Sequence, residues 1–437
     1  MSSFLFADIS LLNEKGEYFP HKYVGVSQSC IDYIGSEDPR IANGANYDEV
    51  FDGRGKLLMP GLYNAHSHVP MTLLRGRGEN LALQPWLYDS IFPFEAEIQE
   101  EDSYYATLLG IAEMLRFGVV SFSDMYYQSD ARAKAVLESG IKANIGHSIS
   151  HFGEDVPYSE LPVCALNKRL IKDYHGKGEG RLLIDFNLHS EYTTTPLVAS
   201  GLAEAALDAG VRIQVHVSET EQEIAECRQR HNQSPVVYLA ERGIFDVPCT
   251  AAHCTYLDEE DLRILSDKGV FIAACPASNA KLGSGIADIM KMKEHGITIC
   301  LGTDGVASNN NLNMFKDMYL LALMHRAYYR NPEGMSSNDI ITISTRNGAL
   351  SQGRNDCGEI KVGNKADLVA LDIDTPWMTP VDSMSSNIVY SLEGSDVVLT
   401  MVDGRVCYRN GEYLTIDIER VMDEVSRSHQ SILSRLQ

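Results

Sequence analysis

The sequence predicts an α/β protein: a (β/α)8 barrel of the TIM type with a small β-sandwich domain built from both termini. Eight short apolar runs alternate with amphipathic helical stretches through the middle of the chain. Strands that alternate with helices indicate βαβ units and a parallel sheet, and eight such units are typical of a closed barrel. Short strand-like runs also occur near both ends of the chain, and histidines and acidic residues recur where the central runs end.

We expect four segments: the N-terminal part of the sandwich (1–58), the barrel (59–355), the C-terminal part of the sandwich (356–415) and a charged amphipathic C-terminal helix (416–437). The N-terminal part contains strand-like runs separated by turn residues, at Phe4–Leu12, Lys22–Val26 and Cys30–Ile34. In the C-terminal part, the turn Asp403-Gly404 follows Val397–Val402 and indicates a hairpin. Because the N-terminal part is incomplete, we expect both parts to form one sandwich.

The central segment supplies the barrel. Its apolar runs are Leu57–His68, Val119–Met125, Ala143–Ile149, Leu182–His189, Val211–Val217, Thr250–His253, Val270–Ala274 and Ile297–Gly302. The helices predicted between them are Glu101–Phe117, Ala131–Ser139, Val163–Tyr174, Pro196–Ala209, Glu221–Arg242, Asp258–Ser266 and Ala287–His295, followed by Met314–Tyr329 and Ile340–Leu350. Glycines such as Gly140 and Gly210 stand where a helix would end. A doubly wound open sheet is the alternative, but no GxGxxG motif opens the first helix.

Composition narrows the class of function. The formal net charge is −23, which argues against nucleic acid or an anionic membrane surface as a partner. No apolar run approaches the ~20 residues of a membrane span. The nine cysteines include no CxxC pair and fit a reduced, cytosolic protein. We therefore expect a cytoplasmic protein that acts on a small molecule, has no nucleic-acid or membrane partner and forms a homo-oligomer.

The stretch Pro60–Pro70, PGLYNAHSHVP, places two histidines one residue apart at the end of the first run. On an extended strand, residues i and i+2 point to the same face, so His66 and His68 can share one cation. The motif is weak alone, because two hydrogen-bonded histidines at a strand end explain it equally well. Further ligands have to come from other strand ends.

Polar residues at the ends of other runs meet this requirement: His189, His216 with Glu219 three residues on, His253 and Asp304. In a barrel, catalytic groups come from the carboxyl ends of the strands. Three imidazoles and one carboxylate suit a catalytic zinc with an open position, and iron or manganese accept the same donors. Such a cation lowers the pKa of a bound water towards about 7. A general acid and base are needed beside it, and Glu219, His253 and Asp304 are the candidates.

Several motifs resemble the amidohydrolase superfamily. They are PGLYNAHSH, HVSE, AAHC, CPASNAKLGSG at Cys275–Gly285, GTDGVASNNNLNMF at Gly302–Phe315 and GEIKVGNKADLVALD at Gly358–Asp372. Within the superfamily, the chain is most similar to the 5′-methylthioadenosine/S-adenosylhomocysteine deaminases, with the triazine hydrolases as cousins. The resemblance covers nearly the whole chain and implies a (β/α)8 barrel with a β-sandwich.

The resemblance implies one divalent metal ion, zinc or else iron or manganese, on His66, His68, His216 and Asp304. Glu219 would protonate the ring nitrogen beside the attacked carbon, and His253 would orient the hydroxide. Asp304 would carry the proton of the hydroxide to the departing ammonia. Superfamily members with two metals use a lysine in the fourth strand, and the matching run LLIDFNLHSEY has none. A single metal is therefore expected.

The deaminase subgroup implies four substrate contacts: Trp86 against the purine, Glu95 on the ribose hydroxyls, His189 on the nucleoside and Ser308 on the substrate side. An aromatic face can stack on a base, and a carboxylate can accept two hydrogen bonds from a cis-diol. The structural alternative for Trp86 is a core anchor at a domain junction.

One departure bears on the substrate. Relatives that bind the amino-acid tail of S-adenosylhomocysteine use arginines for its carboxylate, whereas this chain has His147 and His151 there and Arg169 as the nearest arginine. A histidine cannot replace the bidentate fork of arginine. We expect an aminohydrolase that acts on adenosine, 5′-methylthioadenosine or 5′-deoxyadenosine, with metal-bound hydroxide attacking the amino-bearing carbon and ammonia leaving. Another heterocycle, such as a guanine-like base, pterin or triazine, and a non-catalytic scaffold are the alternatives.

Overall fold

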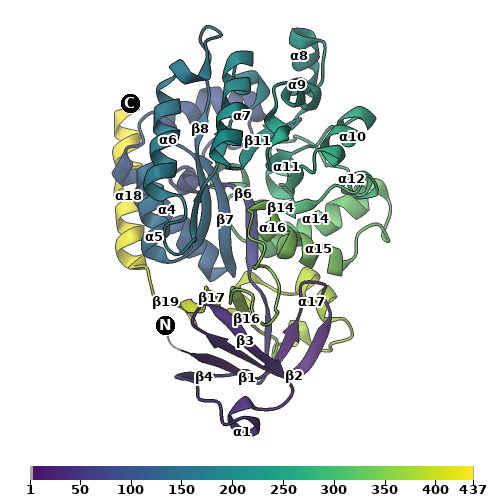
Figure 1. The fold of residues 1–437 in the computed structure, drawn as a ribbon. Coiled ribbons are helices and arrows are strands. Elements are labelled where there is room, and N and C mark those ends of the chain that lie inside the picture. Colours follow the sequence, from purple (N-terminus) through teal and green to yellow (C-terminus); the bar gives the residue numbers. More distant parts are fainter. Residues whose placement is uncertain (1–2, 437) are drawn as a thin grey trace.

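A closed barrel occupies most of the chain, and a smaller sheet lies at one end of it (Figure 1). The computed structural model describes residues 3–436. Residues 1, 2 and 437, which the predicted segments 1–58 and 416–437 include, lie outside the described residues. No helix within the described range is both long enough and apolar enough to span a membrane.

The barrel sheet is parallel throughout, in the order β14-β13-β12-β11-β10-β8-β7-β6-β15, with β9 paired to β8. Its strands are β6 (Leu62–His68), β7 (Val119–Tyr126), β8 (Lys142–Ile149), β9 (Leu182–Ile184), β10 (Phe186–Leu188), β11 (Ile213–Val217), β12 (Cys249–His253), β13 (Phe271–Ala274), β14 (Ile299–Leu301) and β15 (Asp304–Gly305). Only two residues separate β14 and β15, yet β14 pairs with β13 and β15 pairs with β6. The last strand therefore closes the sheet into the predicted barrel.

The first predicted run is two strands instead of one. Residues Lys56–Pro60 form β5, which pairs with the terminal sheet, and β6 begins at Leu62 in the barrel. The chain passes between the sheets at Gly61, where a Cβ would clash with Val120. The fourth predicted run is also divided, into β9 and β10, at Asp185. Apolar content alone does not show where a strand changes its partner.

Helices surround the barrel in the predicted alternation. They are α4 (Glu100–Arg116), α5 (Ser129–Ser139), α6 (Pro162–Tyr174), α7 (Pro196–Ala209), α8 (Glu221–His231), α9 (Pro235–Glu241), α10 (Glu259–Asp267), α12 (Ile289–Glu294), α14 (Met314–Tyr329), α15 (Ser337–Ser344) and α16 (Arg346–Ser351). Gly140 and Gly210 end α5 and α7 in the left-handed conformation, as predicted. The predicted helix Glu221–Arg242 is broken, because Asn232 is left-handed and Ser234-Pro235 starts α9. The predicted helix Ile340–Leu350 is likewise two helices that meet at Thr345.

Short elements fill the loops between these helices and strands. They are α1 (Pro39–Ala42), η1 (Val69–Leu74), α2 (Leu83–Pro85), η2 (Trp86–Ile91), α3 (Phe92–Glu95), η3 (Tyr158–Glu160), η4 (Glu191–Thr193), η5 (Ile244–Asp246), α11 (Pro276–Lys281), α13 (Val306–Asn309), η6 (Pro376–Met378), α17 (Met384–Tyr390) and η7 (Gly394–Asp396). The predicted C-terminal helix is α18 (Ile418–Arg435), which packs along α4 (Figure 1). Together, α2, η2 and α3 cover part of the candidate site described below.

Both ends of the chain form one nine-stranded sheet, in the order β19-β18-β17-β16-β5-β1-β2-β3, with β4 paired to β1. Its strands are β1 (Phe4–Leu12), β2 (Tyr18–Ser27), β3 (Cys30–Gly35), β4 (Glu49–Asp52), β5, β16 (Leu368–Asp372), β17 (Val397–Val402), β18 (Arg405–Arg409) and β19 (Glu412–Tyr413). The N-terminal and C-terminal parts join where β5 pairs antiparallel with β16. Backbone bonds also link residues 363–366 to residues 29–31, so the sheet folds back on itself around its own core.

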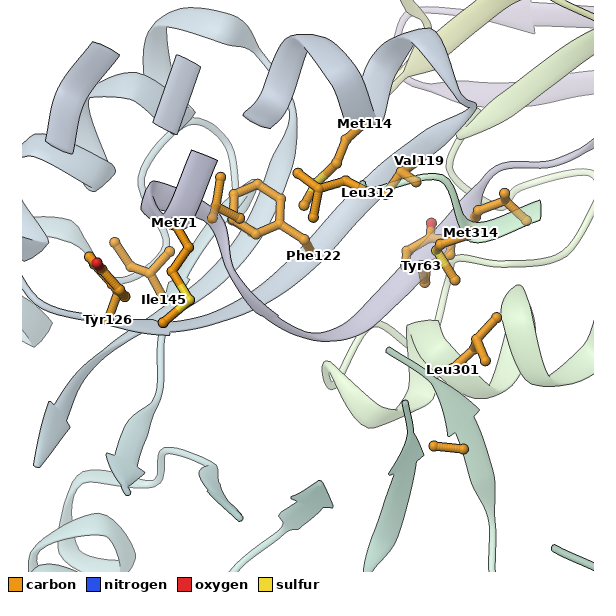
Figure 2. Packing of buried hydrophobic residues seen from close by; sticks show 14 of the residues in the cluster. Tyr63, Met71, Met114, Val119, Phe122, Tyr126, Ile145, Leu301, Leu312 and Met314 are labelled. Atoms are coloured by element: carbon orange, nitrogen blue, oxygen red, sulfur yellow. The ribbon is translucent and has the colours of Figure 1, made fainter. Parts of the chain in front are cut away.

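Apolar side chains from strands and helices pack together between the barrel sheet and the helices that surround it. Figure 2 shows Phe122 of β7 and Ile145 of β8 with Met71 of η1 and Met114 of α4, all buried in one cluster. Each fully buried side chain of this size contributes about 1.5–3 kcal/mol relative to an exposed one. This core fixes the strands whose carboxyl ends carry the polar residues.

A buried ionic cluster joins the terminal sheet to the amino ends of the barrel strands. Lys142, at the start of β8, forms ion pairs with Asp367 and with Asp403, the latter at 2.7 Å from Nζ to Oδ1. Tyr63 donates its hydroxyl to Asp367, and the backbone N–H of Asp403 donates to the same carboxylate at 2.9 Å. All these side chains are nearly inaccessible to solvent. The cluster therefore depends on Lys142 to balance two buried carboxylates.

Replacing Lys142 by Met should lower the free energy of unfolding by about 3–5 kcal/mol, because removal of one member leaves buried charge uncompensated. Urea unfolding followed by circular dichroism measures the change. The exposed Lys168, replaced by Met in the same way, should alter stability by less than about 0.5 kcal/mol. Equal stability of the two variants would contradict a connecting role for the cluster.

Candidate active site

Five of the predicted site residues meet at the carboxyl ends of the barrel strands. His66 and His68 end β6, His216 lies on β11, and His253 ends β12. Asp304 begins β15 and stands in register with Ser67, directly between the two histidines of β6. Barrel closure therefore brings Asp304 from the last strand beside the first.

The inward atoms of these side chains lie close together. The Oδ1 atom of Asp304 is 3.1 Å from His68 Nε2 and 3.5 Å from His66 Nε2. The Nε2 atoms of His68 and His216 are 3.2 Å apart. Two groups of side chains could therefore hold a metal ion. One is His66 with His68 and His216, and the other is His66 with His253 and Asp304. Within each group the ligand atoms lie within 4.8 Å of one another.

Each imidazole is oriented by a hydrogen bond from its outer nitrogen to an oxygen. His66 Nδ1 is 3.0 Å from Gln214 Oε1, and His253 Nδ1 is 2.9 Å from Asn279 Oδ1. Backbone carbonyls accept the bonds of the other two rings, Met125 O from His68 and His189 O from His216, both at 2.6 Å. An oxygen without a hydrogen can only accept, so every Nδ1 carries a proton, and each ring in its neutral form presents the lone pair of Nε2 inward.

This arrangement fits a divalent cation. His66 Nε2 is fully buried and has no hydrogen-bond partner within residues 3–436. The Nε2 atoms of His68 and His216 face each other at hydrogen-bond distance, and both carry lone pairs when the two rings are neutral. A cation among the lone pairs would satisfy all three nitrogens and the carboxylate. Three imidazoles and a carboxylate are donors typical of zinc and similar metals.

Glu219 lies beside the metal-binding group and is almost completely buried. Its Oε1 accepts a hydrogen bond from Ser284 Oγ at 3.3 Å, and its Oε2 is 3.8 Å from His253 Nε2. Burial, together with the charge of Asp304, raises the pKa of Glu219 to about 8. At neutral pH this carboxyl group therefore holds a proton that it can donate.

Asp304 is held by two hydroxyl groups. Its Oδ2 accepts hydrogen bonds from Ser278 Oγ at 2.6 Å and from Ser308 Oγ at 3.1 Å. These bonds leave Oδ1 facing the histidines. Ser308 thus lies against Asp304 in the structure, and its expected contact with substrate stays a prediction.

A cavity opens on the metal-binding group. Trp86, Glu95 and His189 all line it, as do Glu219 and Asp304. Trp86 is also nearly buried, so it contributes to the core as well as to the cavity wall. The described lining residues include no arginine or lysine.

Glu95 is a buried carboxylate on the cavity wall without a hydrogen-bond partner for Oε1 among the described residues. The hydroxyl group of Tyr126, on the same wall, interacts with this carboxyl group and opposes the effect of burial on its pKa. Burial raises the pKa of Glu95 to about 7. A buried carboxyl group with an unpaired oxygen beside a cavity indicates a place for a polar ligand.

The two histidines that replace the expected arginines do not line the cavity. His151 Nε2 bonds to the backbone oxygen of Glu154 at 2.8 Å. Burial lowers the pKa of His147 to about 4, so this ring is neutral. Arg169 pairs with Asp130 at 2.6 Å, and both are largely exposed on α6 and α5. None of these groups places a positive charge against the cavity.

The sequence interpretation missed the residues that orient the site. Gln214 could have been found, because it precedes His216 by two on β11 and therefore faces the same side. Asn279 lies within the CPASNAKLGSG motif but carried no assigned role. The contact of α18 had no signal in the sequence: His429 Nδ1 bonds to Leu73 O at 2.8 Å, and its ring packs against Phe94 beside Glu95.

Comparisons with known proteins agree with this geometry. A 5-methylthioadenosine/S-adenosylhomocysteine deaminase from Acetivibrio thermocellus is 38% identical over 428 residues, 98% of this chain and 98% of that protein. A 5′-deoxyadenosine deaminase from Methanosarcina mazei is 37% identical over 390 residues, 89% of each chain. The crystal structure of an adenosine deaminase from Xanthomonas campestris with bound zinc has a TM-score of 0.92 and 27% identity, covering 99% of this chain and 98% of that chain.

A triazine hydrolase from Arthrobacter aurescens shares the fold at 22% identity, with a TM-score of 0.90 that covers 98% of this chain and 100% of that chain. The sequence model of the amidohydrolase family matches residues 57–407, which include all the predicted site residues. The barrel, the motifs quoted from the sequence and the match to the family model all cover the same part of the chain. This protein belongs to the amidohydrolase family.

Proposed function

We propose that this protein is a metal-dependent hydrolytic deaminase of 6-aminopurine nucleosides. The single observation that supports the proposal most is the grouping of a His₃Asp donor set, a buried Glu219 with a raised pKa and the buried Glu95 around one cavity. Relatives named as deaminases of 5′-methylthioadenosine and 5′-deoxyadenosine support the same class of reaction. The reaction replaces the ring amino group by oxygen and releases ammonia.

The proposed metal ligands are His66, His68, His216 and Asp304. When bound, a divalent cation supplies Lewis acidity and a water of lowered pKa. Zinc is our first choice, with iron or manganese as alternatives, because all three accept these donors. The outward Nδ1 bonds hold the three imidazoles with Nε2 directed inward, so little rearrangement is needed when the cation binds.

The proposed chemistry needs one proton donor and one proton carrier. Glu219, protonated at neutral pH, donates its proton to the ring nitrogen next to the amino-bearing carbon. Asp304 accepts one proton of the attacking water at Oδ1 and passes it to the departing amine. The second proton of the water returns to Glu219 when the carbon–oxygen double bond forms. His253, fixed through Nδ1 by Asn279, holds its Nε2 toward the attacking oxygen. The buried position of all three excludes bulk water from these transfers.

The cavity wall supports the choice of nucleoside. Glu95 would accept hydrogen bonds from the ribose hydroxyls, Trp86 would cover the purine, and His189 and Ser308 would complete the contacts. Without a cationic residue among the described lining, the 5′ end of the substrate should be uncharged. This favours adenosine, 5′-methylthioadenosine and 5′-deoxyadenosine over S-adenosylhomocysteine. The expected cytoplasmic location and homo-oligomeric state stay predictions.

The proposed function is tested with a panel of these nucleosides on zinc-loaded protein, followed by ultraviolet absorbance and ammonia release. We expect turnover of nucleosides with an uncharged 5′ group, and at least ten times lower kcat/KM for S-adenosylhomocysteine, because its carboxylate finds no partner. Guanine, a pterin and a triazine serve as comparison substrates. Activity on one of these comparison substrates and on none of the nucleosides would contradict the proposed substrate class.

Glu219→Gln should retain the metal and lose about 10²- to 10⁴-fold in kcat, because it removes the proton donor without touching a proposed ligand. Metal analysis and steady-state kinetics measure the two effects. Loss of the metal from this variant would show that the role of Glu219 is misassigned.

Glu95 should make nucleoside recognition depend on pH. Its pKa is about 7, and only the ionised carboxylate accepts two strong hydrogen bonds from hydroxyls. The kcat/KM for adenosine should therefore rise about tenfold as pH increases through 7, and Glu95→Gln should abolish this rise. Adenine, which lacks ribose, is the matched control substrate. The same rise with adenine would contradict a ribose contact.

Gln214→Leu should weaken metal binding about 10- to 100-fold, because His66 then loses the partner that orients it. Titration of metal-free protein with zinc, read by calorimetry, measures the affinity. His147→Asn is the matched control, since this partly buried histidine stands on β8 of the same sheet but bonds to no proposed ligand. Unchanged affinity in Gln214→Leu would contradict the proposed site.

A further inference from the structure

A second buried glutamate, Glu223, lies directly behind the proposed proton donor. We infer that Glu223 is a positioning residue, which fixes the backbone at Ser218 and Glu219 and so aims the Glu219 carboxyl group at the substrate. The inference rests on the proposed function, because it assigns Glu223 a role only through Glu219.

The contacts of Glu223 are with the backbone of the segment it would fix. Its Oε1 accepts a hydrogen bond from the N–H of Ser218 at 2.9 Å, and its Oε2 accepts one from the N–H of Glu219 at 2.7 Å. Both oxygens are thus used, one on each of two successive peptide groups. The side chain is almost completely buried, so water does not compete for these bonds.

The backbone at this point has an unusual conformation that needs support. Ser218 follows the end of β11 with a φ of 51°, in the left-handed region that a serine seldom adopts. Its carbonyl oxygen accepts hydrogen bonds from the N–H groups of Thr255 at 3.0 Å and Tyr256 at 3.2 Å. Glu223 accepts hydrogen bonds from the N–H groups of this turn, and the turn's carbonyl oxygen accepts bonds from the next loop. Both kinds of backbone group in the turn are therefore hydrogen-bonded.

Helix capping alone does not explain the residue. Thr220 is the N-cap of α8, and its hydroxyl oxygen accepts a hydrogen bond from the N–H of Glu223 at 3.1 Å. In an ordinary capping box, the glutamate at this position would return to the N–H of Thr220. Here the carboxylate reaches past the cap to the two preceding residues. The sequence Thr-x-x-Glu is therefore used to fix the strand-to-helix turn that carries Glu219.

The burial of Glu223 close to Glu219 also costs free energy. Burying a second carboxyl group near Glu219 is unfavourable, and a neutral side chain would cap α8 without that cost. The cost is offset if the turn needs two acceptors in fixed positions. A misplacement of about 1 Å at a catalytic group can reduce the rate about 100-fold, which is a sufficient reason to hold the turn rigidly.

A double-mutant cycle tests the inference on full-length, zinc-loaded protein. The variants are Glu223→Gln, Glu219→Gln and the double variant, with adenosine as the substrate. Glu223→Gln replaces one acceptor oxygen by an amide donor, so one of the two N–H groups loses its partner. We expect kcat to fall about 10- to 100-fold, with KM changed less than about threefold and with metal content equal to that of the parent protein.

The double variant separates positioning from general structural damage. If Glu223 acts through Glu219, the double variant should be no slower than Glu219→Gln alone, within about threefold. Glu226→Gln, on the same helix but at the surface, should keep the parent rate. If Glu223→Gln yields no folded protein, Glu223→Asp takes its place, because it keeps the carboxyl group but is too short for both bonds.

Two results would overturn the inference: an unchanged kcat in Glu223→Gln, or single losses that multiply in the double variant. Full activity of Glu219→Gln would overturn the proposed proton donor, and the inference with it. This last result can be distinguished from a failure of the inference alone, because it appears in Glu219→Gln, a variant in which Glu223 is intact.

Discussion

Closure of the barrel is the constraint on which the rest of the structure depends. The pairing of β15 with β6 sets Asp304 opposite Ser67 and therefore between His66 and His68. Without this register, the carboxylate and the two imidazoles would be separated by the whole circumference of the sheet. The neighbouring strands then bring His216 and His253 to the same end. A site drawn from the first, middle and last strands is possible only because the sheet is closed.

Burial gives the assembled groups their chemical properties. The outer hydrogen bonds of the imidazoles direct their Nε2 atoms into a nearly water-free space, and a cation bound there would satisfy them. The same burial raises the pKa of Glu219 and of Glu95, so one environment prepares a proton donor and a hydroxyl acceptor. Helix α18 packs against the segment that carries Glu95 and thereby connects the end of the chain to the cavity wall.

Much of this arrangement could be predicted from the sequence, because apolar runs and the polar residues that end them are local patterns. The barrel, the terminal sheet and the convergence of His66, His68, His216 and Asp304 are examples. Contacts between distant segments left no such pattern. The transfer of the chain from one sheet to the other at Gly61 depends on the space beside Val120. The reach of Glu223 past its own helix cap depends on the left-handed turn at Ser218, which sequence spacing does not show.

The central claim is that barrel closure directs four side chains from three strands at one cation. X-ray absorption spectroscopy at the metal edge of zinc-loaded protein tests it most directly, because it reports the atoms bound to the metal and not the consequences of binding. We predict a first shell with three imidazole nitrogens and a carboxylate oxygen, and the loss of one imidazole in His216→Ala. A first shell with sulfur ligands, or one that is unchanged by that substitution, would contradict the account.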